Sequence, residues 1–118
     1  MKKEKVEISL ECRNHIRGVK DCIDLIGGKW KALIIGHLFY IGKMRFMDIK
    51  RQVEGIAPKV LSKELKDLEM NNIVKRIVND TMPVSVEYEL TDFGRSLHSV
   101  IHIMGEWGIK YRKDLFDE

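Results

Sequence analysis

The fold of this chain is decided by the stretch APKVLSKELKDLEMNN, residues 57–72. Its leucines recur at i, i+4 and i+7, which predicts a helix with one narrow apolar stripe: Leu61, Leu65 and Leu68. Pro58 suits the first turn of this helix, and the closing Asn-Asn pair suits its end because asparagine tolerates left-handed backbone. At about 100° per residue, one serine and three lysines gather well away from the leucines. The stretch therefore predicts a helix with one apolar face and one cationic face.

Downstream of this helix the apolar period changes from helical to alternating. Residues 73–78 and 84–90 are rich in β-branched side chains and predict a β-hairpin with a polar tip at residues 79–83. Thr91–Asp92 suits the N-cap of a long final helix over residues 92–116. Its apolar stripe comprises Phe93, Leu97, Val100, Ile101, Met104, Trp107, Gly108, Tyr111 and Leu115. Such a helix is longer than a small three-helix unit covers, so we expect dimerisation through it.

Three shorter helices are predicted upstream. The first covers residues 19–26 and stops at a Gly-Gly pair; the third covers residues 47–53, after an extended connector at residues 43–46. The second ends at Gly42 and carries one apolar face: Trp30, Leu33, Ile34, Leu38 and Ile41. Helices followed by a two-stranded ribbon form a winged helix-turn-helix. The predicted fold class is thus mainly α with a small β-hairpin, in one domain over residues 1–118 with a dimerisation helix at residues 92–116.

Composition excludes several classes of protein. The chain has 118 residues, of which 44% are hydrophobic and 33% charged, which favours a folded domain over disorder. No apolar run is long enough to span a membrane, and the N-terminal residues lack the apolar core of a signal peptide, so we expect a cytoplasmic protein. Two cysteines are too few for a disulfide scaffold. Phosphate-loop, metalloprotease and nucleophile-elbow motifs are absent from the sequence, so neither an enzyme nor a cofactor is expected.

The cationic face of the 58–71 helix is the candidate DNA-binding surface. In a helix-turn-helix the second helix of the pair enters the major groove and the first crosses the backbone. We expect DNA contacts from the second helix at Lys59, Ser62, Lys63 and Lys66, and from the preceding segments at Lys50, Arg51, Arg45, Lys29 and Lys31. The alternatives are a merely solvated lysine face, a winged helix that serves as a protein–protein adaptor, and an RNA-binding protein.

Several motifs carry a resemblance to a known family. They are DLIGGKW at 24–30, RF at 45–46, GI at 55–56, KVL at 59–61, LKDLE at 65–69, VEY at 86–88, LT at 90–91 and Gly94. In order and spacing the chain resembles HxlR-type, MarR-like transcriptional regulators over about residues 18–107. The resemblance implies a homodimer on inverted-repeat operator DNA, with the hairpin as a wing at the minor groove and the terminal helices at the dimer interface. The expected interface residues are Val19, Ile23, Phe93, Leu97, Val100, Ile101, Met104, Trp107 and Tyr111.

The chain departs from the family pattern at two places. A redox-sensing cysteine of some members would fall at Arg17, so we expect no oxidant response by that route. An arginine usual in the wing is replaced by Ser85, which leaves wing contacts to Lys75 and Arg76. Cys22 is interpreted as a core residue, with a reactive thiol as the weaker alternative. His98 and His102 are four residues apart but lack further ligands and are expected opposite the apolar stripe, so a metal site is not expected.

Overall fold

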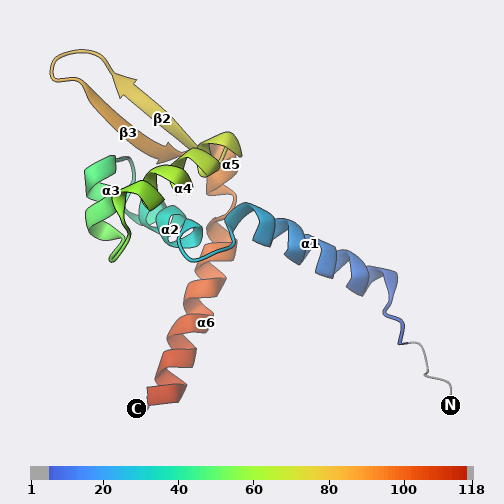
Figure 1. Cartoon of the computed structure of the whole chain (residues 1–118). Coiled ribbons are helices and arrows are strands. Elements are labelled where there is room, and N and C mark those ends of the chain that lie inside the picture. Colours follow the sequence, from blue (N-terminus) through green and yellow to red (C-terminus); the bar gives the residue numbers. More distant parts are fainter. Residues whose placement is uncertain (1–5, 117–118) are drawn as a thin grey trace.

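The computed structural model describes residues 6–116 and is a winged helix-turn-helix with two projecting terminal helices (Figure 1). Its elements, in chain order, are α1 Leu10–Ile26, α2 Lys31–Ile41, β1 Met44–Arg45, α3 Phe46–Gln52, α4 Pro58–Met70, β2 Val74–Asn79, β3 Ser85–Leu90, α5 Asp92–Arg95 and α6 His98–Phe116. The predicted fold class, mainly α with a small sheet and a long C-terminal helix, is confirmed.

The sheet has three strands instead of the predicted two. The order is β1–β3–β2 and all neighbours are antiparallel, with Met44 opposite Tyr88 and Arg45 opposite Glu87. The extended connector thus becomes a short edge strand, because its buried Met44 side chain anchors it beside β3. Strand β1 leads directly into α3, so the helix-turn-helix is tied to the base of the wing.

The core lies where α2, α3 and α4 meet the base of the sheet. Its fully buried side chains are Ile34, Ile35, Ile49, Val53, Leu61, Leu65, Leu68, Ile73 and Val74. The predicted stripe of α4 is confirmed, but the predicted face of α2 is partly wrong, because Leu33 and Ile41 are exposed while Ile35 is buried. The cause is that α2 is apolar nearly all round, so its period does not specify which side meets the core.

Helix α4 ends in a Schellman motif that also positions the C-terminal helices. Asn72 adopts a left-handed φ of 59°, and the Ile73 amide donates to the Leu68 carbonyl at 2.9 Å. The Thr91 hydroxyl donates to the Asn72 carbonyl at 2.6 Å and accepts from the Gly94 amide at 2.9 Å. A Cβ atom on Gly94 would lie 2.1 Å from the Ile73 carbonyl oxygen, so only glycine fits at this crossing.

The final helix is not continuous, contrary to the prediction of one helix over residues 92–116. A short α5 is separated from α6 at Ser96–Leu97, where the Ser96 and Leu97 amides donate three residues back, to Phe93 and Gly94. The Ser96 hydroxyl also donates to the Phe93 carbonyl at 2.5 Å. This tight turn redirects the chain, so α6 leaves the winged helix and projects from it (Figure 1).

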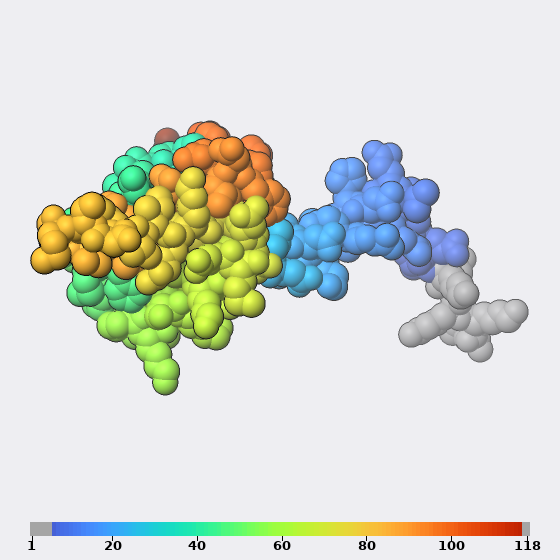
Figure 2. Space-filling model, turned by 90° about the horizontal axis from the view of Figure 1, so that it is seen from above, coloured from blue at the N-terminus to red at the C-terminus, as the bar shows by residue number. Residues whose placement is uncertain are grey.

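The first helix is longer than predicted and projects from the body. It begins at Leu10 because the Ser9 hydroxyl caps it, accepting from the Cys12 amide at 3.1 Å. Of its residues, only Ile26 is buried. Seen from above, α1 stands clear of the winged helix, and the molecule measures 74 × 39 × 25 Å (Figure 2). Both terminal helices therefore present surfaces that their own chain does not cover.

Candidate nucleic-acid interface

Helix α4 presents its polar face outward because its leucines hold the opposite face in the core. Leu61, Leu65 and Leu68 are each at most 1% exposed. The predicted contact residues of α4 are all exposed: Lys59, Ser62, Lys63 and Lys66. Lysine ammonium groups neutralise phosphates or donate to guanine, and a serine hydroxyl can donate or accept. We call these four residues the α4 face.

Acidic neighbours modify the charge of the α4 face. Lys63 lies 3.6 Å from Asp67 on the next turn, and its side chain is 71% exposed. In the described part of the chain, Lys59 and Lys66 have no carboxylate oxygen within 4 Å. Two of the three lysines are thus uncompensated, and the third is held by a solvent-accessible pair that gives little stability.

Lys31 does not extend the cationic face, contrary to the prediction. Its side chain is 15% exposed and lies 2.5 Å from Glu64 and 3.5 Å from Asp67. Burial lowers the pKa of Lys31, but the hydrogen bonds and charges of Glu64 and Asp67 outweigh burial, and the net pKa is raised above 10.5. Lys31 therefore ties the start of α2 to the inner flank of α4.

The segments before α4 supply further cations. Arg51 on α3 is exposed and pairs with Asp48 one turn earlier, while Lys50 is half-buried. Arg45 is exposed on the edge strand β1. Lys29, which precedes α2, is exposed and lies over the Trp30 ring, 4.6 Å from its centroid. All four predicted residues have access to solvent, but they come from three separate elements.

The wing carries less positive charge than the helices. In residues 74–90, Lys75 and Arg76 oppose three acidic residues, which gives 2 − 3 = −1. Lys75 lies 3.3 Å from Glu89 on the neighbouring strand, and Arg76 is exposed. Ser85 is half-buried at the start of β3. The base of the wing therefore offers one unpaired cation, Arg76, within the described residues.

The predicted dimer residues divide between the core and the surface. Leu97 is 9% exposed and belongs to the chain's own core, so its prediction as an interface residue is wrong; the turn before α6 points it inward. Val100 and Ile101 are half-buried against that core. The exposed members are Val19, Ile23, Phe93, Met104, Trp107 and Tyr111. Trp107 and Tyr111 stack on each other, with ring centroids 5.4 Å apart.

The cysteines and histidines show no assembled reactive or metal site. Cys22 is half-buried against the core and Cys12 is exposed; ten residues of helix, about 15 Å, separate them, too far for a disulfide within one chain. His98 does not lie opposite the apolar stripe as predicted, because its ring stacks on Phe39 of α2 at 4.0 Å. Within residues 6–116 no three potential ligands converge on a metal position.

The family follows from a match over most of the chain. The model of the HxlR-like helix-turn-helix family matches residues 25–115. The chain belongs to the HxlR-like helix-turn-helix family. The resemblance found in the sequence is confirmed, and the match extends further into α6 than the motifs indicated. Within the described residues, no helix of this family member is both long and apolar enough to cross a membrane.

Relatives of this HxlR-like protein are transcriptional regulators. It is 37% identical over 111 residues to the HTH-type transcriptional regulator YtcD of Bacillus subtilis, covering 94% of this chain and 80% of that protein. The redox regulator HypR in its reduced form matches with a TM-score of 0.77 at 40% identity, over 83% of this chain and 96% of that one. A MarR-family regulator from Enterococcus faecalis matches with a TM-score of 0.73 at 25% identity, over 95% and 96%.

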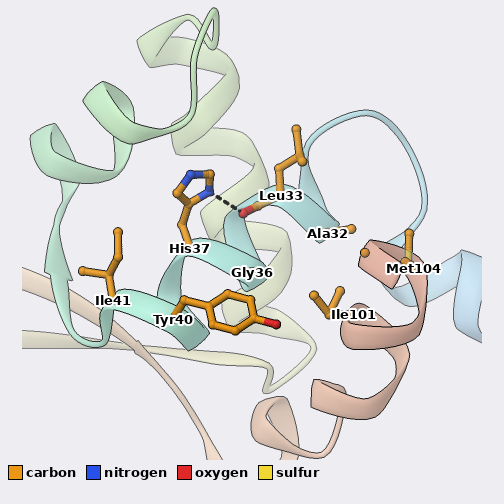
Figure 3. A pocket seen from close by; sticks show the side chains of 9 residues that line it. Ala32, Leu33, Gly36, His37, Tyr40, Ile41, Ile101 and Met104 are labelled. Carbon is orange, nitrogen blue, oxygen red and sulfur yellow. Dashed lines mark hydrogen bonds between the residues drawn. The ribbon is translucent and has the colours of Figure 1, made fainter. Parts of the chain in front are cut away.

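One surface of this HxlR-like chain is not predicted by its sequence motifs. Helices α2 and α6 enclose an open apolar groove of about 560 Å³ (Figure 3), lined by Ala32, Leu33, Gly36, His37, Tyr40 and Ile41 of α2 and by Ile101, Met104 and Gly105 of α6. We call it the α2–α6 groove. The sequence signal for this groove is that α2 is apolar nearly all round, so its side chains exceed what a single buried face requires.

Proposed function

We propose that this protein is a transcriptional regulator that binds duplex DNA sequence-specifically, as a homodimer on an inverted-repeat operator. The observation that carries the proposal is the α4 face: Lys59, Ser62, Lys63 and Lys66 are exposed opposite three fully buried leucines. Helix α4 is the second helix of the pair, the position that enters the major groove in helix-turn-helix proteins.

The other cations are assigned to the phosphate backbone. Lys50 and Arg51 lie on α3, which in this fold crosses the backbone. Arg45 directly precedes α3, and Lys29 precedes α2. The hairpin β2–β3 serves as the wing; Lys75, nearest the body, is shared with Glu89, and Arg76 is the next cation along β2. Because phosphate contacts release counterions, the affinity for any duplex should fall steeply with salt.

The homodimer is assigned to the exposed apolar faces of the terminal helices. Trp107 is 69% exposed and Met104 and Tyr111 are each 51% exposed, all on α6, in which no residue is fully buried. A two-fold dimer places two α4 helices on half-sites about 34 Å apart, one turn of DNA, or a multiple of that spacing. Substituting both Met104 and Trp107 by glutamine should give monomers that keep weak non-specific binding and lose operator affinity; sedimentation with and without operator measures this.

The deciding experiment is enrichment of genomic fragments by the purified protein, followed by a salt titration on the recovered sequence. A recovered inverted repeat, bound with a steep salt dependence, supports the proposal. An adaptor without DNA binding would enrich no sequence, and RNA competing better than the duplex operator would favour an RNA ligand. The α4 face argues against the adaptor, because lysines are depleted at protein interfaces, whereas aromatic residues are enriched there.

A further inference from the structure

Helix α4 carries as many carboxylates as lysines. Between Pro58 and Met70 three lysines oppose three acidic residues, which gives 3 − 3 = 0. The acidic residues are Glu64, Asp67 and Glu69. A carboxylate beside the α4 face repels DNA phosphates and competes with them for the lysine ammonium groups. The positive charge that α4 presents to DNA therefore depends on what neutralises its carboxylates, and Lys31 of α2 contacts two of them.

The position of Lys31 is explained by α4 and not by its own helix. Lys31 is the first residue of α2, and the first turn of α2 contains no acidic residue. Because the helix dipole disfavours a cation at the N-terminus, Lys31 does not stabilise α2 locally. Its ammonium group lies 2.5 Å from Oε1 of Glu64 and 3.5 Å from Oδ2 of Asp67. Burial alone would lower the pKa of Lys31, but the two carboxylates raise it, so Lys31 is charged at neutral pH.

Asp67 is shared between two lysines. The Nζ atoms of Lys31 and Lys63 lie 3.5 Å and 3.6 Å from the same oxygen, Oδ2. Both distances exceed the roughly 2.7–2.9 Å of a strong charge-assisted hydrogen bond. The Lys63 side chain is 71% exposed, and a lysine four residues before an acid is the weaker orientation of a helical ion pair. Lys63 can therefore leave Asp67 at little cost in free energy while Lys31 stays in place.

We propose that Lys31 is a positioning residue for DNA binding: it holds the Asp67 carboxylate and thereby leaves Lys63 free to contact a DNA phosphate. This inference rests on the proposed function and assigns to it a residue that does not itself touch DNA. When Lys63 turns to a phosphate, Asp67 keeps Lys31 as a cationic partner. Without Lys31, Lys63 is the one lysine within 4 Å of Asp67 in the described part of the chain, so a phosphate must compete with that carboxylate for it.

Replacing Lys31 by methionine tests the proposal, in a Glu64→Gln background. The background removes the charge of Glu64, whose side chain is only 14% exposed and would otherwise be left unpaired. On random duplex, adding Lys31→Met should lower the slope of log affinity against log salt by about 0.9 per bound protomer, the share of one phosphate contact. The affinity per protomer at 0.1 M salt should fall about eightfold, taking 1 M salt as the point at which such contacts contribute nothing.

Two rescue variants of equal net charge separate the possible explanations. Adding Asp67→Asn to the Lys31→Met protein removes the competing carboxylate and should restore the slope and the affinity of the background. Adding Glu69→Gln instead removes an exposed carboxylate of the same helix, about 200° round α4 from Asp67, and should leave the slope low. Equal rescue by both variants would mean that only the net charge of α4 matters. Rescue by neither would mean that Lys31 acts through the fold alone, and either result overturns the proposal.

Fluorescence anisotropy at several salt concentrations gives the slopes, and circular dichroism checks that each variant is folded. The control Lys110→Met removes a lysine that lies 2.7 Å from Asp114 on α6, and it should keep the slope of the background. If wild type and background bind duplex with a steep salt dependence but Lys31→Met leaves the slope unchanged, this inference fails and the proposed function stands. If the wild type shows no salt-dependent binding to duplex, both fail.

Discussion

Replacing Lys59, Lys63 and Lys66 together by alanine should remove three phosphate-neutralising charges from the α4 face without unfolding the protein. Each lysine that contacts phosphate contributes about 0.9 to the slope of log affinity against log salt, so three contribute about 2.7. Over a fourfold rise in salt, a slope of 2.7 corresponds to about 40-fold in affinity. Per bound protomer, the wild type should therefore lose about 40-fold more affinity than the variant between 50 and 200 mM salt, and for a dimer bound through both α4 faces the slope difference doubles to about 5.4, on the order of 1,000-fold.

The structure indicates that the variant keeps its fold. Lys59, Lys63 and Lys66 are exposed, and alanine favours helix at least as well as lysine. Removing Lys63 takes one partner from Asp67, but Asp67 keeps Lys31 at 3.5 Å, so no carboxylate is left unpaired. The free energy of unfolding should stay within about 0.5 kcal/mol of the wild type, as for other surface substitutions.

Fluorescence anisotropy of labelled operator and of random duplex, at several salt concentrations, measures both slopes. A matched control removes three cations from the far end of α6, Lys110, Arg112 and Lys113, and should keep the wild-type slope on random duplex. A lysine that contacts a guanine base should add a further loss of binding free energy, about 1–3 kcal/mol, on the operator but not on random duplex. Unchanged operator affinity and slope in the α4 variant, with the dimer intact, would refute the assignment of α4 as the recognition helix.

Four other outcomes are expected. Gly94→Ala should destabilise the fold by about 1–3 kcal/mol or more in urea unfolding, because its Cβ would overlap the Ile73 carbonyl; wild-type stability would contradict that crossing. Glu64→Gln should cost about 1–3 kcal/mol, since it weakens the pair with Lys31. Because the pKa of Lys31 is raised, its stabilisation is complete below pH 10.5 and is lost as the pH rises through the raised value, so Lys31→Met should show a weaker alkaline loss. Diamide should leave operator binding intact; a reductant-reversible loss that disappears in Cys22→Ser would show a reactive thiol instead.

Local sequence patterns determined the elements whose form depends mainly on residues close together in the chain. The leucine period of residues 58–70 specified both α4 and its buried side, because the stripe is narrow and the rest of the helix is polar. The same pattern placed Lys59, Ser62, Lys63 and Lys66 on the exposed face. Asn72 could be predicted at the end of α4 because the left-handed conformation is a property of a single residue. The hairpin followed from its alternation and its polar tip.

Only the tertiary structure decided the features that depend on two distant segments. Met44–Arg45 is a strand because β3 lies beside it, and the final helix is interrupted next to the crossing of Gly94 and Ile73. Lys31 and Lys59 are the same residue type, yet Glu64 and Asp67 bury one of them in an ion pair while the other stays in solvent. Period and composition describe neighbours along the chain, whereas these outcomes depend on which surfaces meet after folding. Because α2 is apolar on nearly all sides, its sequence has no helical period that would indicate which side is buried.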